Sequence, residues 1–166
     1  MRNVNAIPSN VEIRPATAND AAEVGHLAAQ FAAYLRSLGD TTDFQFTTEA
    51  YLRDGFGPNP AFAGIVAETE GHLVGYLLYH LGYDTDSAVR IMHVVDLYVQ
   101  ADARAHGIGT ALLYEAARIC QEAGGSRLFW AVLSANKLAA QFYEHLGAHY
   151  VQELRFMAWW PGWPRH

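Results

Sequence analysis

Three short stretches of the chain carry residues whose types and spacing suit chemistry. The first, residues 104–110, reads R-A-H-G-I-G-T and joins an apolar run to an amphipathic segment. The first N–H groups of a helix lack partners inside the helix, and the helix dipole favours negative charge there. Glycine lets that backbone approach an anion, and arginine adds positive charge. The stretch therefore predicts a pyrophosphate site; the alternative is a glycine-containing turn that binds nothing.

The second stretch, residues 136–148, places a tyrosine where it can move a proton. Asn136 and Tyr143 are separated by about two helical turns, so in a helix they lie on roughly the same face. A tyrosine hydroxyl beside a leaving group can donate a proton to it. The alternative for Tyr143 is a core aromatic residue whose hydroxyl reaches water.

The third stretch, residues 91–99, is a β-rich run with two titratable side chains. Strict alternation puts His93 and Val95 on one face and Asp96 on the other, unless a bulge turns Asp96 round. His93 lies roughly 6.6 Å from Val95 along such a strand, and a neutral imidazole there can take up a proton through one water near neutral pH. The alternative for His93 and for Asp96 is hydrogen-bonded structure.

Changes of hydrophobic period predict the elements that position these stretches. Strands are expected at residues 11–14, 61–68, 73–79, 91–99, 127–133 and 149–159, the second and third forming a hairpin. Helices are expected at residues 17–38, 48–53 and 136–145, with another running from the Gly107–Gly109 turn to Gly124. The mixture indicates an α+β or mixed α/β fold. We expect one domain at residues 11–160, with tails at 1–10 and 161–166.

Composition narrows the class of protein. At 166 residues the chain is long enough for a real core, and 51% of its residues are hydrophobic. A net charge of −6 disfavours nucleic acid or an anionic membrane as the main partner, because both need a basic surface. The single cysteine excludes a disulfide within one chain. With no long apolar span, we expect a soluble cytoplasmic protein.

Several familiar motifs are absent from the sequence. The eight histidines show no metal-binding spacing, and there is no C-x-x-C pair, so we expect no metal. There is no phosphate-binding loop of the Walker type, and Ser134 lacks a nucleophile elbow. Asp96 precedes the glycine turn, whereas the acid of a dinucleotide fingerprint follows it by about 20 residues. A nucleotide-binding module is therefore a weaker interpretation.

The motifs resemble those of a known family. Arg104-x-x-Gly107-x-Gly109 resembles the acetyl-CoA pyrophosphate motif of GNAT N-acetyltransferases. The run from Asn136 through Tyr143 to Gly147 resembles their later helix, whose tyrosine commonly protonates the departing CoA thiolate. More narrowly, segments in the same order resemble the spermidine/spermine (diamine) acetyltransferase branch; they are residues 13–17, 54–57, 83–84, 96–99 and 130–133. The match spans roughly residues 11–158.

The resemblance implies a V-shaped, mixed central sheet flanked by helices, with acetyl-CoA in the gap where two strands part. It implies a homodimer and a small amine as partner. The implied cofactor contacts are the backbone of Leu97, Tyr98 and Val99, the phosphate site of Arg104, Ala105, His106, Gly107, Ile108, Gly109 and Thr110, and a far wall of Asn136, Ala139 and Tyr143. The candidate catalytic residues are Tyr143, His93 and Asp96, and the candidate acceptor contacts are Tyr34, Asp84 and Asp96.

The chain departs from the diamine branch at three positions. Val95 stands where the branch carries the usual glutamate base, Leu35 stands where an acid often follows Tyr34, and Ala105 replaces a glycine. The first two changes remove negative charge expected near a polyamine. These changes leave acetyl-CoA binding intact, and the resemblance still implies acetyl transfer to a small primary amine of the diamine or polyamine kind. The alternatives are an amino acid-like or antibiotic amine, or an acyl-CoA-binding or regulatory domain with little catalysis.

Overall fold

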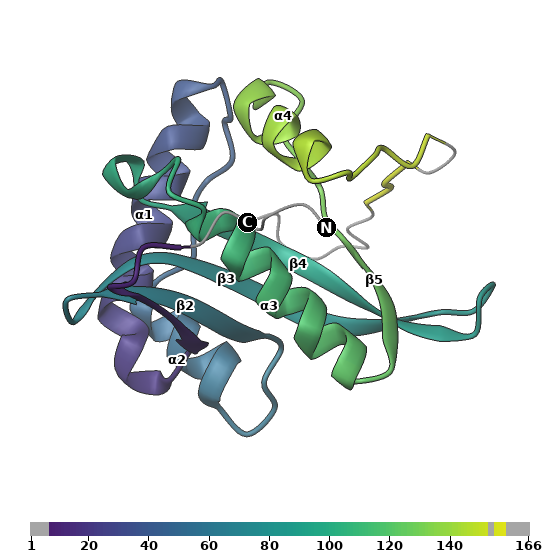
Figure 1. Cartoon of the computed structure of the whole chain (residues 1–166), viewed down its shortest axis with the longest axis horizontal. Coiled ribbons are helices and arrows are strands. Elements are labelled where there is room, and N and C mark those ends of the chain that lie inside the picture. Colours follow the sequence, from purple (N-terminus) through teal and green to yellow (C-terminus); the bar gives the residue numbers. More distant parts are fainter. Residues whose placement is uncertain (1–6, 153–154, 159–166) are drawn as a thin grey trace.

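A computed structural model describes residues 7–152 and 155–158 and shows a five-stranded sheet with helices on both faces (Figure 1). The strands lie in chain order, and all neighbours are antiparallel except the last two, which are parallel. The strands are β1 (Val11–Pro15), β2 (Ala63–Thr69), β3 (His72–Asp84), β4 (Val89–Val99) and β5 (Gly125–Phe129). The helices are α1 (Ala21–Ser37), α2 (Thr48–Phe56), α3 (Ile108–Glu122) and α4 (Lys137–His145), with short 3₁₀ turns at Ala18–Asp20 and Ala101–Ala103.

The predicted hairpin between β2 and β3 is confirmed. Its two turn residues, Glu70 and Gly71, have φ values of 51° and 80°. Two successive positive φ values are typical of the type I′ turn, whose twist matches that of the flanking strands. β3 and β4 form a second hairpin, which the sequence did not predict; both strands are longer than expected, and the hairpin tip extends past β5 (Figure 1).

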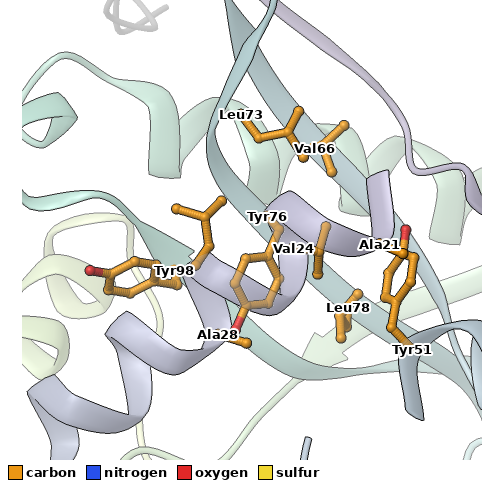
Figure 2. Packing of buried hydrophobic residues seen from close by; sticks show 10 residues of the cluster. Ala21, Val24, Ala28, Tyr51, Val66, Leu73, Tyr76, Leu78 and Tyr98 are labelled. Atoms are coloured by element: carbon orange, nitrogen blue, oxygen red, sulfur yellow. The ribbon is translucent and has the colours of Figure 1, made fainter. Parts of the chain in front are cut away.

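The sheet separates two apolar cores. On one face, α1 and α2 pack on β2, β3 and β4, where Val24, Tyr51 and Tyr76 are fully buried (Figure 2). On the other face, α3 buries Leu112 and Ala116 against the sheet. The apolar positions of α1 and α3 recur at helical spacing, which is why each helix presents one stripe to the sheet.

An ion-pair network holds β1 against the start of α1. Arg14 donates to both carboxylate oxygens of Asp20 at 2.8 and 2.9 Å, and to Glu68 at 2.8 Å. The backbone N–H of Thr17 also donates to the Asp20 carboxylate, at 2.7 Å. The Arg14 guanidinium lowers the pKa of Asp20, because it stabilises the charged carboxylate. The buried charge of Asp20 is therefore paired.

The prediction of a last strand at residues 149–159 is wrong wherever the structure describes that segment. Residues 149–152 and 155–158 are not in a strand, while 153–154 and Trp159 lie outside the described residues. A strand needs a neighbour for its backbone hydrogen bonds, and apolar residues alone do not supply one. β5 also ends earlier than predicted, at Phe129. Among the described helices, none combines the length and the apolar character needed to cross a membrane.

Candidate active site

The site begins where β4 and β5 part. Their parallel pairing runs from Arg90 opposite Gly125 to His93 opposite Phe129, where β5 ends. β4 continues to Val99 while pairing only with β3. The β5 side of that last part of β4 therefore keeps backbone groups that no strand of the described chain takes up. This is the opening expected of a V-shaped sheet.

A β-bulge at Val95 decides which way the candidate base points. Val94 pairs with Tyr79 and Asp96 with Leu78, so Val95 is an extra residue on β4. Strict alternation over residues 91–99 does not hold beyond this point; the alternative that the sequence left open, a bulge that turns Asp96 round, is what the register shows. Val94 remains in the core under α3, whereas Asp96 accepts a hydrogen bond of 3.3 Å from Tyr76 on the α1 face.

Burial increases the proton affinity of the Asp96 carboxylate. It raises the pKa of this carboxyl to about 6, an effect that the hydrogen bond from Tyr76 partly offsets. A carboxylate with a raised pKa holds a proton more strongly than an ordinary aspartate does, so it is better suited to accept one from an amine. The sequence did not indicate Tyr76 as the partner, because the register of β3 against β4 cannot be read from either strand alone.

Tyr143 of α4 lies within the electrostatic reach of Asp96. Its ring packs against Trp130 with centroids 4.8 Å apart and against Phe142 at 5.2 Å. Burial, and secondly the negative charge of Asp96, raise the pKa of Tyr143 to about 12. The charge of Asp96 thus acts on Tyr143, a residue that the sequence singled out separately, and the raised pKa keeps the tyrosine protonated.

The other catalytic candidate, His93, is engaged elsewhere. Its Nδ1 lies 2.9 Å from Nε2 of His80 on the neighbouring strand, and its ring stacks on Phe129 with centroids 4.8 Å apart. Burial and the neighbouring His80 lower the pKa of His93. Among the described residues, hydrogen bonds join the His93 side chain to His80 alone.

The glycine-containing stretch forms the N-terminus of α3, as predicted. Gly107 is its N-cap residue with φ 79°, and the first helical hydrogen bond runs from Ala111 N–H to Gly107 C=O at 2.9 Å. In the described structure, the N–H groups of residues 105–110 have no backbone acceptor. Ala105 adopts φ 65°, a conformation costing a residue with a Cβ about 1 kcal/mol or more. Successive free N–H groups at a helix start fit a pyrophosphate.

Arg104 is held in place at the start of this stretch, residues 104–110, which we call the cradle. Its Nε donates to Val99 C=O at 2.8 Å, and its guanidinium carbon lies 5.1 Å from the ring centre of Tyr34 and 5.4 Å from that of Tyr98. Its two terminal nitrogens make no hydrogen bond within the described residues, so they remain suited to a phosphate. The stacking on two tyrosines was not predictable from the sequence, because the rings come from α1 and β4.

The far wall of the expected cofactor gap begins at Asn136, the N-cap residue of α4. Asn136 is only 6% exposed, and its Oδ1 accepts from the backbone N–H of Ala139 at 3.2 Å and from the Tyr34 hydroxyl at 3.0 Å. α4 comes close to α3 at Gly109, where an added Cβ would lie 3.3 Å from the Phe142 ring. These contacts place α4 beside α1 and beside the start of α3, where the cradle lies.

Two candidate acceptor contacts are in unexpected places. Asp84 ends β3, where its carboxylate pairs with Arg127 and accepts from Ser87 at 3.0 Å. Its partner in the register is Val89, roughly 23 Å along β4 from Asp96. The structure does not bring Asp84 to the Asp96–Tyr143 pair. Tyr34 is near the site, but its hydroxyl is bonded to Asn136.

Comparison with known proteins agrees with this geometry. The Acetyltransferase (GNAT) family matches residues 29–148. The chain is 34% identical over 151 residues to thialysine N-epsilon-acetyltransferase of Bos taurus, covering 86% of each protein. It is 29% identical over 144 residues to spermidine/spermine N(1)-acetyltransferase-like protein 1 of Homo sapiens, covering 82% of this chain and 20% of that one.

Solved structures have the same fold. An integron cassette protein from the mobile metagenome of V. cholerae superposes with a TM-score of 0.77 at 21% identity, covering 93% of this chain and 95% of that one. The chain therefore belongs to the GNAT acetyltransferase family. By family it is an acetyl-CoA-dependent N-acetyltransferase.

The cradle makes a first prediction. In Gly107→Val a β-branched side chain is forced into a left-handed conformation and stands beside the free N–H groups, so the Kd for CoA should rise at least tenfold, about 1.4 kcal/mol. Isothermal titration calorimetry with CoA measures the change.

Gly124→Val is the matched control, because Gly124 has nearly the same φ, 77°, and ends α3 rather than starting it. An added Cβ there meets nothing within 4 Å. This control should lose comparable stability and keep its affinity for CoA. Equal losses of affinity in both variants would mean that Gly107 matters only for folding.

Proposed function

We propose that this protein transfers the acetyl group of acetyl-CoA to a primary amine at the end of a short aliphatic chain, as in a diamine or a lysine-like amino acid. The observation that carries the proposal is that the charge of Asp96 acts on Tyr143, while burial moves the pKa values of the two groups to about 6 and about 12. Two groups whose surroundings push their pKa values apart are suited to act as base and acid at one site.

Each residue has a part in this proposal. Asp96 takes the proton that the attacking amine loses, in place of the glutamate that Val95 replaces. Tyr143 holds its proton until the thiolate leaves and then gives it up. When bound, acetyl-CoA supplies an acetyl group activated as a thioester. The free N–H groups of the cradle, with Arg104, bind its pyrophosphate, and Asn136 and Ala139 line its path.

The choice of acceptor is supported by the relatives and by the charges of the site. Thialysine and spermidine, the amines after which two of the relatives are named, share a terminal primary amine on a short chain. Val95, next to Asp96, is 45% exposed. It therefore offers an apolar surface at the position where the glutamate of the diamine branch would attract a second positive charge of the acceptor. We therefore infer that one terminal amine is recognised, and that the rest of the acceptor contributes less through charge.

The proposal is tested with a panel of amines at equal concentration, with acetyl-CoA and a thiol-detecting reagent. The panel holds thialysine, lysine, ornithine, putrescine, spermidine and an aminoglycoside. We expect the largest kcat/KM with a short-chain terminal amine and at least a tenfold lower value with the aminoglycoside. Tight CoA binding with no thiol release from any amine would instead identify an acyl-CoA-binding domain.

Tyr143→Phe is the matched variant for this assay. It keeps the ring that packs on Trp130 and Phe142 but removes the proton, so kcat should fall about a hundredfold or more. The Kd for CoA should stay within about twofold, because the hydroxyl acts only in the reaction. A variant that keeps the full turnover, measured where chemistry limits the rate, would exclude Tyr143 as the acid.

We also propose a homodimer, as the resemblance implies. Phe156 and Met157 are 84% and 97% exposed, and β5 pairs on one side only among the described strands. Apolar side chains and an unpaired strand edge of this kind are suited to a second copy of the chain. Sedimentation equilibrium at micromolar protein should give twice the mass of one chain. The mass of a single chain at those concentrations would refute the proposal.

A further inference from the structure

Tyr34 joins three elements that surround the cofactor side of the site. It lies in α1, and its hydroxyl bonds at 3.0 Å to Asn136, which caps α4 and is 102 positions away in sequence. Its ring centre lies 5.1 Å from the guanidinium carbon of Arg104, at the start of the cradle. One side chain of α1 therefore contacts both the far wall and the phosphate loop.

Two hydrogen bonds hold the Asn136 side chain in one orientation. The backbone N–H of Ala139 can only donate, so the atom of Asn136 that lies 3.2 Å from it is the oxygen, Oδ1. The Tyr34 hydroxyl, which bonds to the same oxygen, is then a donor as well. If the amide turned over, Nδ2 would face the Ala139 N–H and that bond would be lost, whereas the Tyr34 hydroxyl would have to change from donor to acceptor.

That orientation leaves the amide nitrogen of Asn136 available. No acceptor for Nδ2 occurs among the hydrogen bonds of the described residues. No fully buried side-chain nitrogen in the described part of the chain lacks a partner, so Nδ2 keeps an exposed edge although Asn136 is only 6% exposed. A donor held in this way suits a carbonyl oxygen of an extended amide-bearing ligand.

The ring of Tyr34 acts on a second part of the site. The Arg104 guanidinium lies near the rings of Tyr34 and Tyr98, and its Nε bonds to Val99 C=O. The two ring contacts and the bond to Val99 together limit the movement of the guanidinium, so its terminal nitrogens are held in place without help from a ligand. Tyr98 is in turn stacked on Phe31 of α1, with centroids 5.3 Å apart.

We propose that Tyr34 is a positioning residue for the cofactor rather than a contact of the acceptor amine. Its hydroxyl holds Asn136 so that Nδ2 faces an amide carbonyl of the pantetheine arm of CoA, and its ring holds Arg104 toward the pyrophosphate. This inference rests on the acetyl-CoA site of the proposed function but not on the identity of the amine.

The test measures CoA binding by calorimetry in the absence of amine, together with steady-state kinetics. Tyr34→Phe keeps the ring and loses only the hydroxyl, so the Kd for CoA and the KM for acetyl-CoA should rise about three- to tenfold. kcat and the KM for the amine should change by less than about twofold. Tyr34→Leu, which also loses the ring beside Arg104, should weaken CoA binding further. Tyr114→Phe, at an exposed tyrosine of α3, is the control and should behave as wild type.

A double-mutant cycle separates positioning from general loosening of the fold. Asn136→Ser retains an oxygen that can cap α4 but lacks the amide nitrogen. If Tyr34 acts through Asn136, adding Tyr34→Phe to Asn136→Ser should weaken CoA binding by less than about twofold.

Three results would overturn the inference. They are additive losses in this cycle, a Tyr34→Phe protein with unchanged CoA affinity, and a rise in the KM for the amine alone. A wild-type protein that does not bind CoA would overturn the proposed function and this inference together.

Discussion

The extra residue in β4 is the constraint on which the rest of the site depends. Val95 has no partner on β3, so the alternation of side chains is reversed after it: Asp96 and Tyr98 lie on the face opposite to Met92 and Val94. Asp96 consequently lies on the face of the sheet that α1 covers, where it accepts a hydrogen bond from Tyr76. Burial there raises its pKa to about 6, and its charge is felt by Tyr143. Without the bulge, alternation would turn the same carboxylate into the packed core under α3.

The remaining parts of the site follow from the ends of secondary-structure elements. β5 stops at Phe129 while β4 continues, which opens the sheet, and α3 begins at Gly107, which leaves a row of N–H groups free. Backbone geometry alone thus supplies a row of free N–H groups beside an opening. A side chain of a third element holds these two parts in position relative to each other, because Tyr34 of α1 contacts both Arg104 and Asn136. The helix that covers one core therefore also supports the cofactor side.

Much of this arrangement could be predicted from sequence because it depends on local chemistry. The turn at Glu70–Gly71, the cradle and the cap of α4 at Asn136 are read from residues that are neighbours in the chain. What could not be predicted depends on register and on distant partners. The bulge exists only relative to β3, the hydrogen bond of Asp96 comes from Tyr76, and the tyrosines around Arg104 come from two other elements. The predicted last strand failed for the same reason, since alternation of apolar residues does not specify a partner.

The central claim is that the bulge makes Asp96 the proton acceptor. It is tested most directly by the pH dependence of kcat/KM, measured with the best amine of the panel for wild type, Asp96→Asn and His93→Gln. A base with a pKa of about 6 must lose its proton to act, so activity should fall below an inflection near pH 6 in wild type. We predict that His93→Gln keeps this inflection, while Asp96→Asn loses both the inflection and most of the activity. An inflection that persists in Asp96→Asn and disappears in His93→Gln would contradict the account and assign the proton transfer to the histidine.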